Sequence, residues 1–116
     1  MGSGDGWRPA VPLDELREGK AVAVAVEEAR VLLVRWGREI HAVSDRCTHQ
    51  GAPLHRGVVR AAGSPKTVTC PIHGSVFQLT DGRVLRGPAT TPLAAYDTRV
   101  VDGIVEVRPR AAPPGP

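Results

Sequence analysis

The chain has 116 residues, which is the size of one domain and leaves no room for a separate catalytic domain beside it. It contains one Phe, one Tyr, two Trp and one Met, so Val, Leu, Ala and Ile have to build the core, which favours strands over long helices. The net charge is +3, but the fifteen basic residues are scattered singly among twelve acidic ones. This scatter argues against a nucleic-acid-binding surface.

Hydropathy and cysteine content bear on the compartment of the protein. No apolar run approaches the roughly 20 residues that a membrane-spanning helix needs, and no signal-peptide core follows the first residues. We therefore expect a cytoplasmic, soluble protein, and a monomer. In a reducing compartment, the two cysteines are expected to bind metal or to take part in redox chemistry rather than to form a disulfide.

The two ends of the chain differ in composition from the part between them. Residues 1–6 are mostly Gly and Ser, and residues 109–116 are rich in Pro and Ala. Both are predicted to be flexible segments without a packing pattern. Residues 7–108 are the single predicted domain.

The first half of this domain is predicted to be an edge strand followed by a β-meander. Two prolines restrict the first strand, residues 7–11, to a sheet edge. Leu13 and Leu16 have helical spacing before Gly19, which predicts a connector of one or two turns. Apolar or alternating runs separated by turn-forming residues then predict strands over residues 21–26, 31–36 and 40–44.

The second half contains two turn-rich stretches among further short strands. Residues 45–57 are predicted to form a long loop and residues 71–75 a tight one, because glycine and proline recur in them. Strands are predicted over residues 58–60, 66–70, 76–79, 83–85, 94–101 and 104–107. Many short strands with regular turn signals predict an all-β fold, either an antiparallel β-sandwich or a small barrel.

Each turn-rich stretch combines one cysteine with one histidine. Cys47 and His49 are two positions apart, and Cys70 and His73 are three apart around a proline. Two thiolates and two imidazoles suit a structural zinc ion or a Rieske [2Fe–2S] centre, in which two histidines replace two cysteines on one iron. Zinc sites usually contribute Cys-x-x-Cys pairs, so the spacing favours the iron–sulfur cluster.

The sequence around both pairs resembles the paired cluster-binding loops of Rieske proteins. Residues 47–54 match the family pattern C-x-H-x-G-x-x-L, and residues 70–77 match C-P-x-H-G-x-x-F. The resemblance implies one [2Fe–2S] cluster per chain, held at one tip of the fold. It implies that two cysteines bind one iron and two histidines the other: Cys47 and Cys70, His49 and His73. It also implies that neighbouring residues shape and support the loops: Gly51, Pro53, Gly74, Ser75, Phe77 and Pro88.

Departures from the family pattern predict the subtype. The Rieske proteins of respiratory complexes, which this chain resembles, carry an extra cysteine in each loop, and these two cysteines form a disulfide. In this chain Ile72 occupies the position of the extra cysteine in the second loop. Ser75 is retained and could donate a hydrogen bond to a bridging sulfide, whereas Phe77 replaces a tyrosine donor. Fewer donors predict a reduction potential at the low end of the Rieske range, about −150 mV rather than +300 mV.

The resemblance implies a one-electron carrier rather than an enzyme. Such a ferredoxin takes electrons from a flavin-dependent reductase and passes them to an oxygenase or similar terminal enzyme, which would dock over His49 and His73. A catalytic oxygenase subunit also needs a 2-His-1-carboxylate iron site, for which only His41 and His55 remain. Both are expected to be ordinary side chains. The alternative is an accessory subunit, or a domain of a larger redox protein.

Three arginines flank the two loops: Arg46, Arg56 and Arg86. They could form a positive rim around the histidines, or they could be an ordinary solvated surface. Sequence alone favours the solvated surface.

Overall fold

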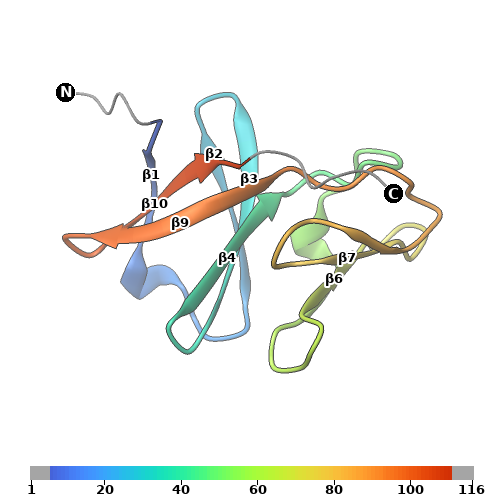
Figure 1. The fold of residues 1–116 in the computed structure, drawn as a ribbon, viewed down its shortest axis with the longest axis horizontal. Coiled ribbons are helices and arrows are strands. Elements are labelled where there is room, and N and C mark those ends of the chain that lie inside the picture. Colours follow the sequence, from blue (N-terminus) through green and yellow to red (C-terminus); the bar gives the residue numbers. More distant parts are fainter. Residues whose placement is uncertain (1–5, 111–116) are drawn as a thin grey trace.

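Two antiparallel sheets make up residues 6–110, the part of the chain that this computed structural model describes (Figure 1). The larger sheet has the strand order β1-β10-β9-β4-β3-β2, and the smaller has the order β5-β6-β7-β8. Within residues 6–110 the only helical segments are two short 3-10 turns, so the predicted all-β class is confirmed.

The elements follow the predicted ones closely. The larger sheet consists of β1 (Arg8–Pro12), β2 (Ala21–Val26), β3 (Ala29–Trp36), β4 (Glu39–Ser44), β9 (Ala95–Val101) and β10 (Ile104–Pro109). The smaller sheet consists of β5 (Val58–Arg60), β6 (Thr67–Thr69), β7 (Val76–Gln78) and β8 (Val84–Arg86). The 3-10 turns are η1 (Leu13–Glu15), which replaces the predicted helical connector, and η2 (Leu54–Arg56).

Strand β3 lies between two hydrophobic cores, and this explains its unbroken apolar run. Its four central residues have no exposed surface: Val31, Leu32, Leu33 and Val34. Successive side chains of a strand point to opposite faces. The even-numbered pair therefore packs in the core that includes Phe77 of the smaller sheet, and the odd-numbered pair packs in the core that includes Val105. The second core lies inside the larger sheet, which curls until β1 lies against β2.

The smaller sheet is an insertion between two neighbouring strands of the larger one. The chain leaves β4, forms β5 to β8, and returns as β9, which pairs directly with β4 through Ala42 opposite Tyr96 and Val43 opposite Ala95. In Figure 1 the green, yellow and orange loops of this insertion gather at one end of the molecule, away from β1 and β10. The predicted tip with two loops is at this end.

Most of the predicted flexible ends lie outside the described residues, so the proposed boundaries at residues 7 and 108 stay predictions. At the C-terminal side, Pro109 still pairs with Tyr96, and the Arg110 guanidinium donates a hydrogen bond of 3.1 Å to Asp97. Ordered structure therefore continues at least to residue 110. Across the described range, no helix has the length and apolar character that crossing a membrane requires.

Candidate metal centre

The first loop, residues 45–57, connects β4 to β5 and folds back at its cysteine. The Cys47 N–H donates to the Ala52 carbonyl at 2.9 Å, and the Gly51 N–H donates to the Cys47 carbonyl at 2.7 Å. Gly51 has a φ of +74°, a conformation that side chains other than glycine rarely adopt. Pro53 forms an isolated β-bridge with the residue before the cysteine. These contacts explain why the sequence places glycine four residues after cysteine.

The second loop, residues 70–75, repeats this construction between β6 and β7. The Cys70 N–H donates to the Ser75 carbonyl at 2.8 Å, and the Gly74 N–H donates to the Cys70 carbonyl at 3.3 Å. Gly74 also has a positive φ, of +79°. Each cysteine therefore uses its own N–H and carbonyl to close its loop, with a left-handed glycine four residues on. The shared cysteine-to-glycine spacing of the two sequence patterns has this physical origin.

Both cysteines are free and lie side by side beneath the loops. Cys47 is 2% exposed and Cys70 5% exposed, and the two residues are close enough for Cys70 to affect the ionisation of Cys47. Burial raises the pKa of the Cys47 thiol, and the neighbouring Cys70 adds to the increase. The backbone N–H groups of His49 and Gln50 act in the opposite direction by donating to the Cys47 sulfur, the first at 3.4 Å. These N–H groups are preset to stabilise a thiolate.

The two loop histidines also lie next to each other, but at the protein surface, whereas the cysteines are buried. The rings of His49 and His73 lie 5.4 Å apart between centroids, edge to face, and both residues are exposed. Among residues 6–110, no three His, Cys, Asp or Glu side chains converge on one ion-sized point. The donors are therefore grouped as two sulfurs and two imidazoles. This grouping fits a two-iron cluster with unlike ends better than a single zinc ion, which needs all four ligands at one point.

A buried hydroxyl joins a third segment to the second loop. Ser75 has no exposed surface, and its Oγ accepts the Ala89 N–H at 2.9 Å. This bond holds the turn containing Pro88 against the loop. Because Ala89 supplies the donor, the Ser75 hydroxyl proton remains available for a further acceptor. Phe77 points into the core between the sheets and is completely buried.

The end of the first loop lies directly against the start of the second at Gly57, whose role the sequence did not reveal. A Cβ at this position would lie 1.8 Å from the Thr69 carbonyl oxygen and 3.2 Å from Pro71. Its φ is −87° and its ψ is −162°, an extended conformation that other residues also adopt. Gly57 is therefore required for close contact, not for a left-handed conformation. It lets the end of the first loop lie against the start of the second.

A contact between a carboxylate and an imidazole at the base of the first loop was also missed. The Asp45 carboxylate is buried, accepts the His55 N–H at 2.7 Å, and lies 2.7 Å from the His55 Nδ1. The Leu54 N–H donates to the Asp45 carbonyl at 2.7 Å. These bonds join the two ends of the loop. His55 therefore has a structural contact with a buried carboxylate, although 31% of its side chain is exposed. His41 is an ordinary strand side chain, 3.1 Å from the Glu39 carboxylate.

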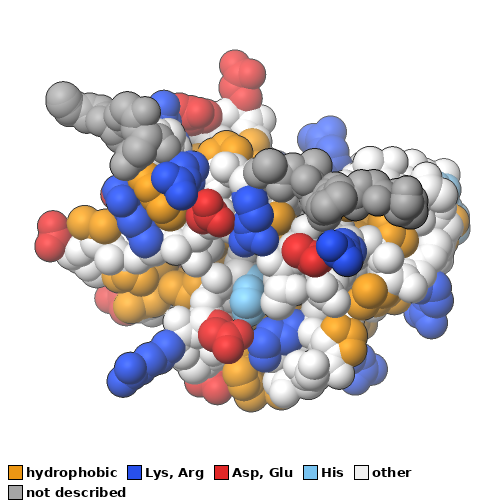
Figure 2. Space-filling model, viewed as in Figure 1, with side chains coloured by type: hydrophobic (Ala, Val, Ile, Leu, Met, Phe, Trp, Pro, Cys, Tyr) orange, Lys and Arg blue, Asp and Glu red, His pale blue; other side chains and the backbone are white. Residues whose placement is uncertain are grey.

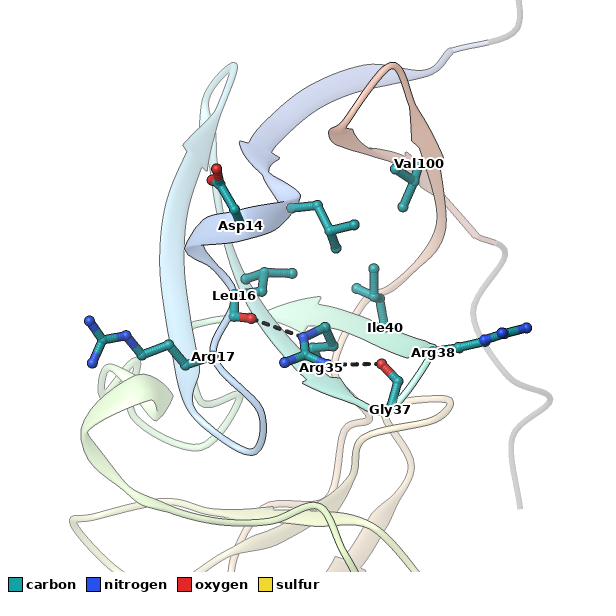
Figure 3. Close-up of a pocket in the computed structure, with 9 residues that line it drawn as sticks. Asp14, Leu16, Arg17, Arg35, Gly37, Arg38, Ile40 and Val100 are labelled. Carbon is teal, nitrogen blue, oxygen red and sulfur yellow. Dashed lines mark hydrogen bonds between the residues drawn. The ribbon is translucent and has the colours of Figure 1, made fainter.

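A cavity of about 540 Å³ lies elsewhere, between η1, the β3–β4 turn and the end of β9 (Figure 3). Arg35 crosses it and donates to the carbonyls of Leu16 and Gly37 at 2.9 and 3.0 Å. In Figure 3 the side chains of Arg17 and Arg38 point away from the cavity on opposite sides. None of its lining residues belongs to the two loops.

Paired thiols and paired imidazoles on two loops of an all-β fold define the class of Rieske iron–sulfur proteins. The family model of the Rieske [2Fe-2S] domain matches residues 6–97, and this chain belongs to that family. Its cofactor is a Rieske [2Fe–2S] cluster, as the sequence predicted.

Relatives of this chain include ferredoxins. It is 33% identical to the anthranilate 1,2-dioxygenase ferredoxin subunit of Burkholderia cepacia, over 87% of this chain and 90% of that protein. The solved ferredoxin of carbazole 1,9a-dioxygenase from Nocardioides aromaticivorans IC177 superposes with a TM-score of 0.82, at 30% identity, over 90% of this chain and 99% of that one. These relatives confirm the predicted role of an electron carrier that is not itself an enzyme.

A second group of relatives has a different assignment. A solved structure described as an NADH-dependent nitrite reductase small subunit, from Mycobacterium tuberculosis, superposes with a TM-score of 0.76 at 32% identity. The match covers 91% of this chain and 96% of that one.

Proposed function

We propose that this chain is a Rieske ferredoxin that carries single electrons from a flavin-dependent reductase to a terminal oxygenase. Cys47 and Cys70 bind one iron, and His49 and His73 bind the other. The observation that supports this ligand set is the separation of two buried, neighbouring thiols from two exposed imidazoles on the same two loops. The oxygenase partner is supported by the names of the ferredoxin relatives.

Some residues of the chain bury the redox centre, and others expose it to a partner. When bound, the cluster supplies a site that accepts and releases one electron. The buried thiolates keep its inner end away from water, and the N–H groups of the first loop stabilise their charge. The exposed histidines give a partner the shortest path to the centre, so docking takes place over His49 and His73.

The surroundings of the site support a low reduction potential. Ser75 places a buried hydroxyl at the second loop, whereas Phe77 has no hydroxyl to donate. Weaker hydrogen bonding to the centre stabilises its reduced, more negative form less. We infer a potential near the low end of the Rieske range, about −150 mV. A cytoplasmic location agrees with cysteines that have to stay reduced until they bind iron.

A second candidate function is the small subunit of a nitrite reductase. The structural match to the Mycobacterium tuberculosis protein supports it, at 32% identity. In that case the chain would be an accessory subunit, bound permanently to a larger enzyme, rather than a ferredoxin that shuttles between partners. The two candidates share the cluster and its ligands but differ in the protein that receives the electron.

The proposed function is tested first on the chain alone. We expect two irons and two acid-labile sulfides per chain, and a spectrum that His73→Ala and Cys47→Ser abolish while the matched variant His41→Ala keeps it. One zinc ion and no sulfide would reject the cluster. A native spectrum in either ligand variant would remove that residue from the ligand set.

A second experiment separates the two candidate partners. The reduced protein is mixed with the purified oxygenase component or with the purified nitrite reductase large subunit encoded in the same genome. We expect rapid oxidation by the oxygenase and no stable complex on gel filtration. Stable co-elution with the nitrite reductase subunit, together with inactivity toward the oxygenase, would establish the accessory-subunit function instead.

A further inference from the structure

Charge is distributed unequally between the two parts of the fold. From Asp45 to Tyr96, the segment that forms the loops and the smaller sheet, the chain has six basic residues and two acidic residues. The rest of residues 6–110 has nine basic and nine acidic residues. Of the two acids in the insertion, Asp45 is buried and Asp81 lies 3.1 Å from Arg83. The end of the molecule that carries the candidate metal centre is therefore positive.

Three arginines, which we call the rim arginines, lie on or next to the two loops that carry the histidines: Arg46, Arg56 and Arg86. Arg46 directly precedes the first cysteine, and its side chain lies over Gly51. Arg56 ends η2 within the first loop, and Arg86 pairs with Val76, the residue that follows the second loop. Figure 2 shows Lys and Arg side chains in blue around the edge of this end of the molecule, on the right of the view.

Within the described range, the rim arginines have no partner, unlike several arginines of the larger sheet. All three are exposed, and none forms an ion pair or side-chain hydrogen bond with another residue of the described range. In the larger sheet, by contrast, Arg108 lies 3.2 Å from Asp97 and Arg35 lies 3.6 Å from Glu18. Pairing cancels much of the field of a charge, whereas an unpaired guanidinium keeps it. The field at the loops is therefore stronger than the net charge of +3 suggests.

The second loop also exposes an apolar side chain. Ile72 lies beside His73 at the tip of the second loop and is 56% exposed. Protein interfaces commonly have an apolar centre enclosed by a polar or charged rim. Exposed imidazoles, an exposed isoleucine and unpaired arginines together have this arrangement. The solvated-surface interpretation of the arginines does not account for the exposed isoleucine on the same loops.

We propose that the redox partner binds this face through an acidic surface, with carboxylates opposite Arg46, Arg56 and Arg86 and an apolar contact on Ile72. This inference rests on the proposed electron-carrier function and adds the chemical character of the partner. Charge complementarity of this kind mainly raises the rate of association and orients the partner. It places the acceptor over the histidines.

The proposal is tested with two small oxidants of opposite charge and the reduced holoprotein. Ferricyanide, an anion, takes one electron and becomes ferrocyanide; hexaamminecobalt(III), a cation, takes one electron and becomes cobalt(II). The ratio of the two rate constants at low ionic strength reports the charge at the site where the electron leaves. It is insensitive to changes in the reduction potential of the protein, because such changes affect both rates.

Two triple variants with the same change in net charge locate the effect. The test variant is Arg46→Glu, Arg56→Glu and Arg86→Glu. The control variant is Arg17→Glu, Lys20→Glu and Arg38→Glu, at exposed positions of the larger sheet's half of the fold. Steering by local charge changes rates by one or more orders of magnitude. We expect the ratio of anion to cation rate to fall by about tenfold or more in the test variant and by less than about twofold in the control.

Each other outcome is informative. An equal fall in both triple variants would show that only net charge matters, and an unchanged ratio in the test variant would show that the arginines lie away from the exit site; either result overturns the proposal. If the test variant loses its cluster, the single variants Arg86→Glu and Arg38→Glu are compared instead, again by the ratio of the anion rate to the cation rate. A wild-type protein without a reducible cluster would instead reject the proposed function itself.

Discussion

Replacing Gly57 by alanine should loosen both loops at once. The backbone there has an ordinary extended conformation, so alanine introduces no conformational strain of its own. The added methyl group, however, would lie 1.8 Å from the Thr69 carbonyl oxygen, and real contacts of this type stay above 3.0 Å. The first loop and β6 therefore have to separate by more than an ångström. Thr69 directly precedes Cys70, so this displacement reaches the second cysteine.

The cost follows from the size of that displacement. Forcing an extra methyl group into a packed contact typically costs about 1–3 kcal/mol. For a domain of this length, that corresponds to a fall in midpoint temperature of roughly 5–20 °C. Because the displaced atoms belong to both loops, the cluster should also be lost faster than the sheets unfold. Visible circular dichroism follows the cluster, and far-ultraviolet circular dichroism follows the strands.

A matched substitution is available in the same hairpin. Gly63 lies in the turn between β5 and β6, has no positive φ, and has no atom within 4 Å of an added Cβ. We expect Gly63→Ala to change the free energy of unfolding by less than about 0.5 kcal/mol and to keep the cluster. If Gly57→Ala proved as stable as Gly63→Ala and lost its cluster no faster, the close approach would not be what holds the loops together.

Three further predictions concern single side chains. His55→Phe should destabilise the protein by about 1–3 kcal/mol in denaturant titrations, because Asp45 stays buried without its ring partner; an unchanged midpoint would contradict this. Ser75→Ala should lower the voltammetric potential and destabilise the loop by about 1–3 kcal/mol, since the Ala89 N–H loses its acceptor; a raised potential would contradict this. Burial raises the pKa of Tyr96, the only tyrosine, above the value of 10.0 for an unperturbed side chain. Its contribution to stability is therefore full below about pH 10 and is lost as pH rises through the folded pKa, which an absorbance titration measures; ionisation at or below pH 10.0 in the folded protein would refute it.

Local patterns in the sequence predicted most of the strands because periodicity and turn residues act over short distances. The alternating residues of β2 and the glycine and proline positions of the loops are signals of this kind. Strand β3 was predicted to begin at Val31, whereas it begins at Ala29, because the left-handed residue Glu27 confines the preceding turn to two residues. The cysteines and histidines were also within reach, since each pair is only two or three residues apart.

The features that the sequence did not predict depend on contacts between residues that are distant along the chain. The close approach of Gly57 to Thr69, the bond between Asp45 and His55, and the insertion of the smaller sheet between β4 and β9 all join residues ten or more positions apart. No local pattern marks such partners. The sequence analysis treated the basic residues as scattered, because the shortage of acids over residues 45–96 matters only once the fold brings that segment to one end of the molecule.

The central claim is that two histidines and two cysteines bind opposite ends of one cluster. Pulsed electron paramagnetic resonance on the reduced protein, prepared with ¹⁵N-labelled histidine, tests it most directly. We expect strong coupling to two labelled nitrogens, and their loss together with the native signal when His49 or His73 is replaced. A signal without coupled histidine nitrogens, or one that survives both replacements, would contradict the ligand set.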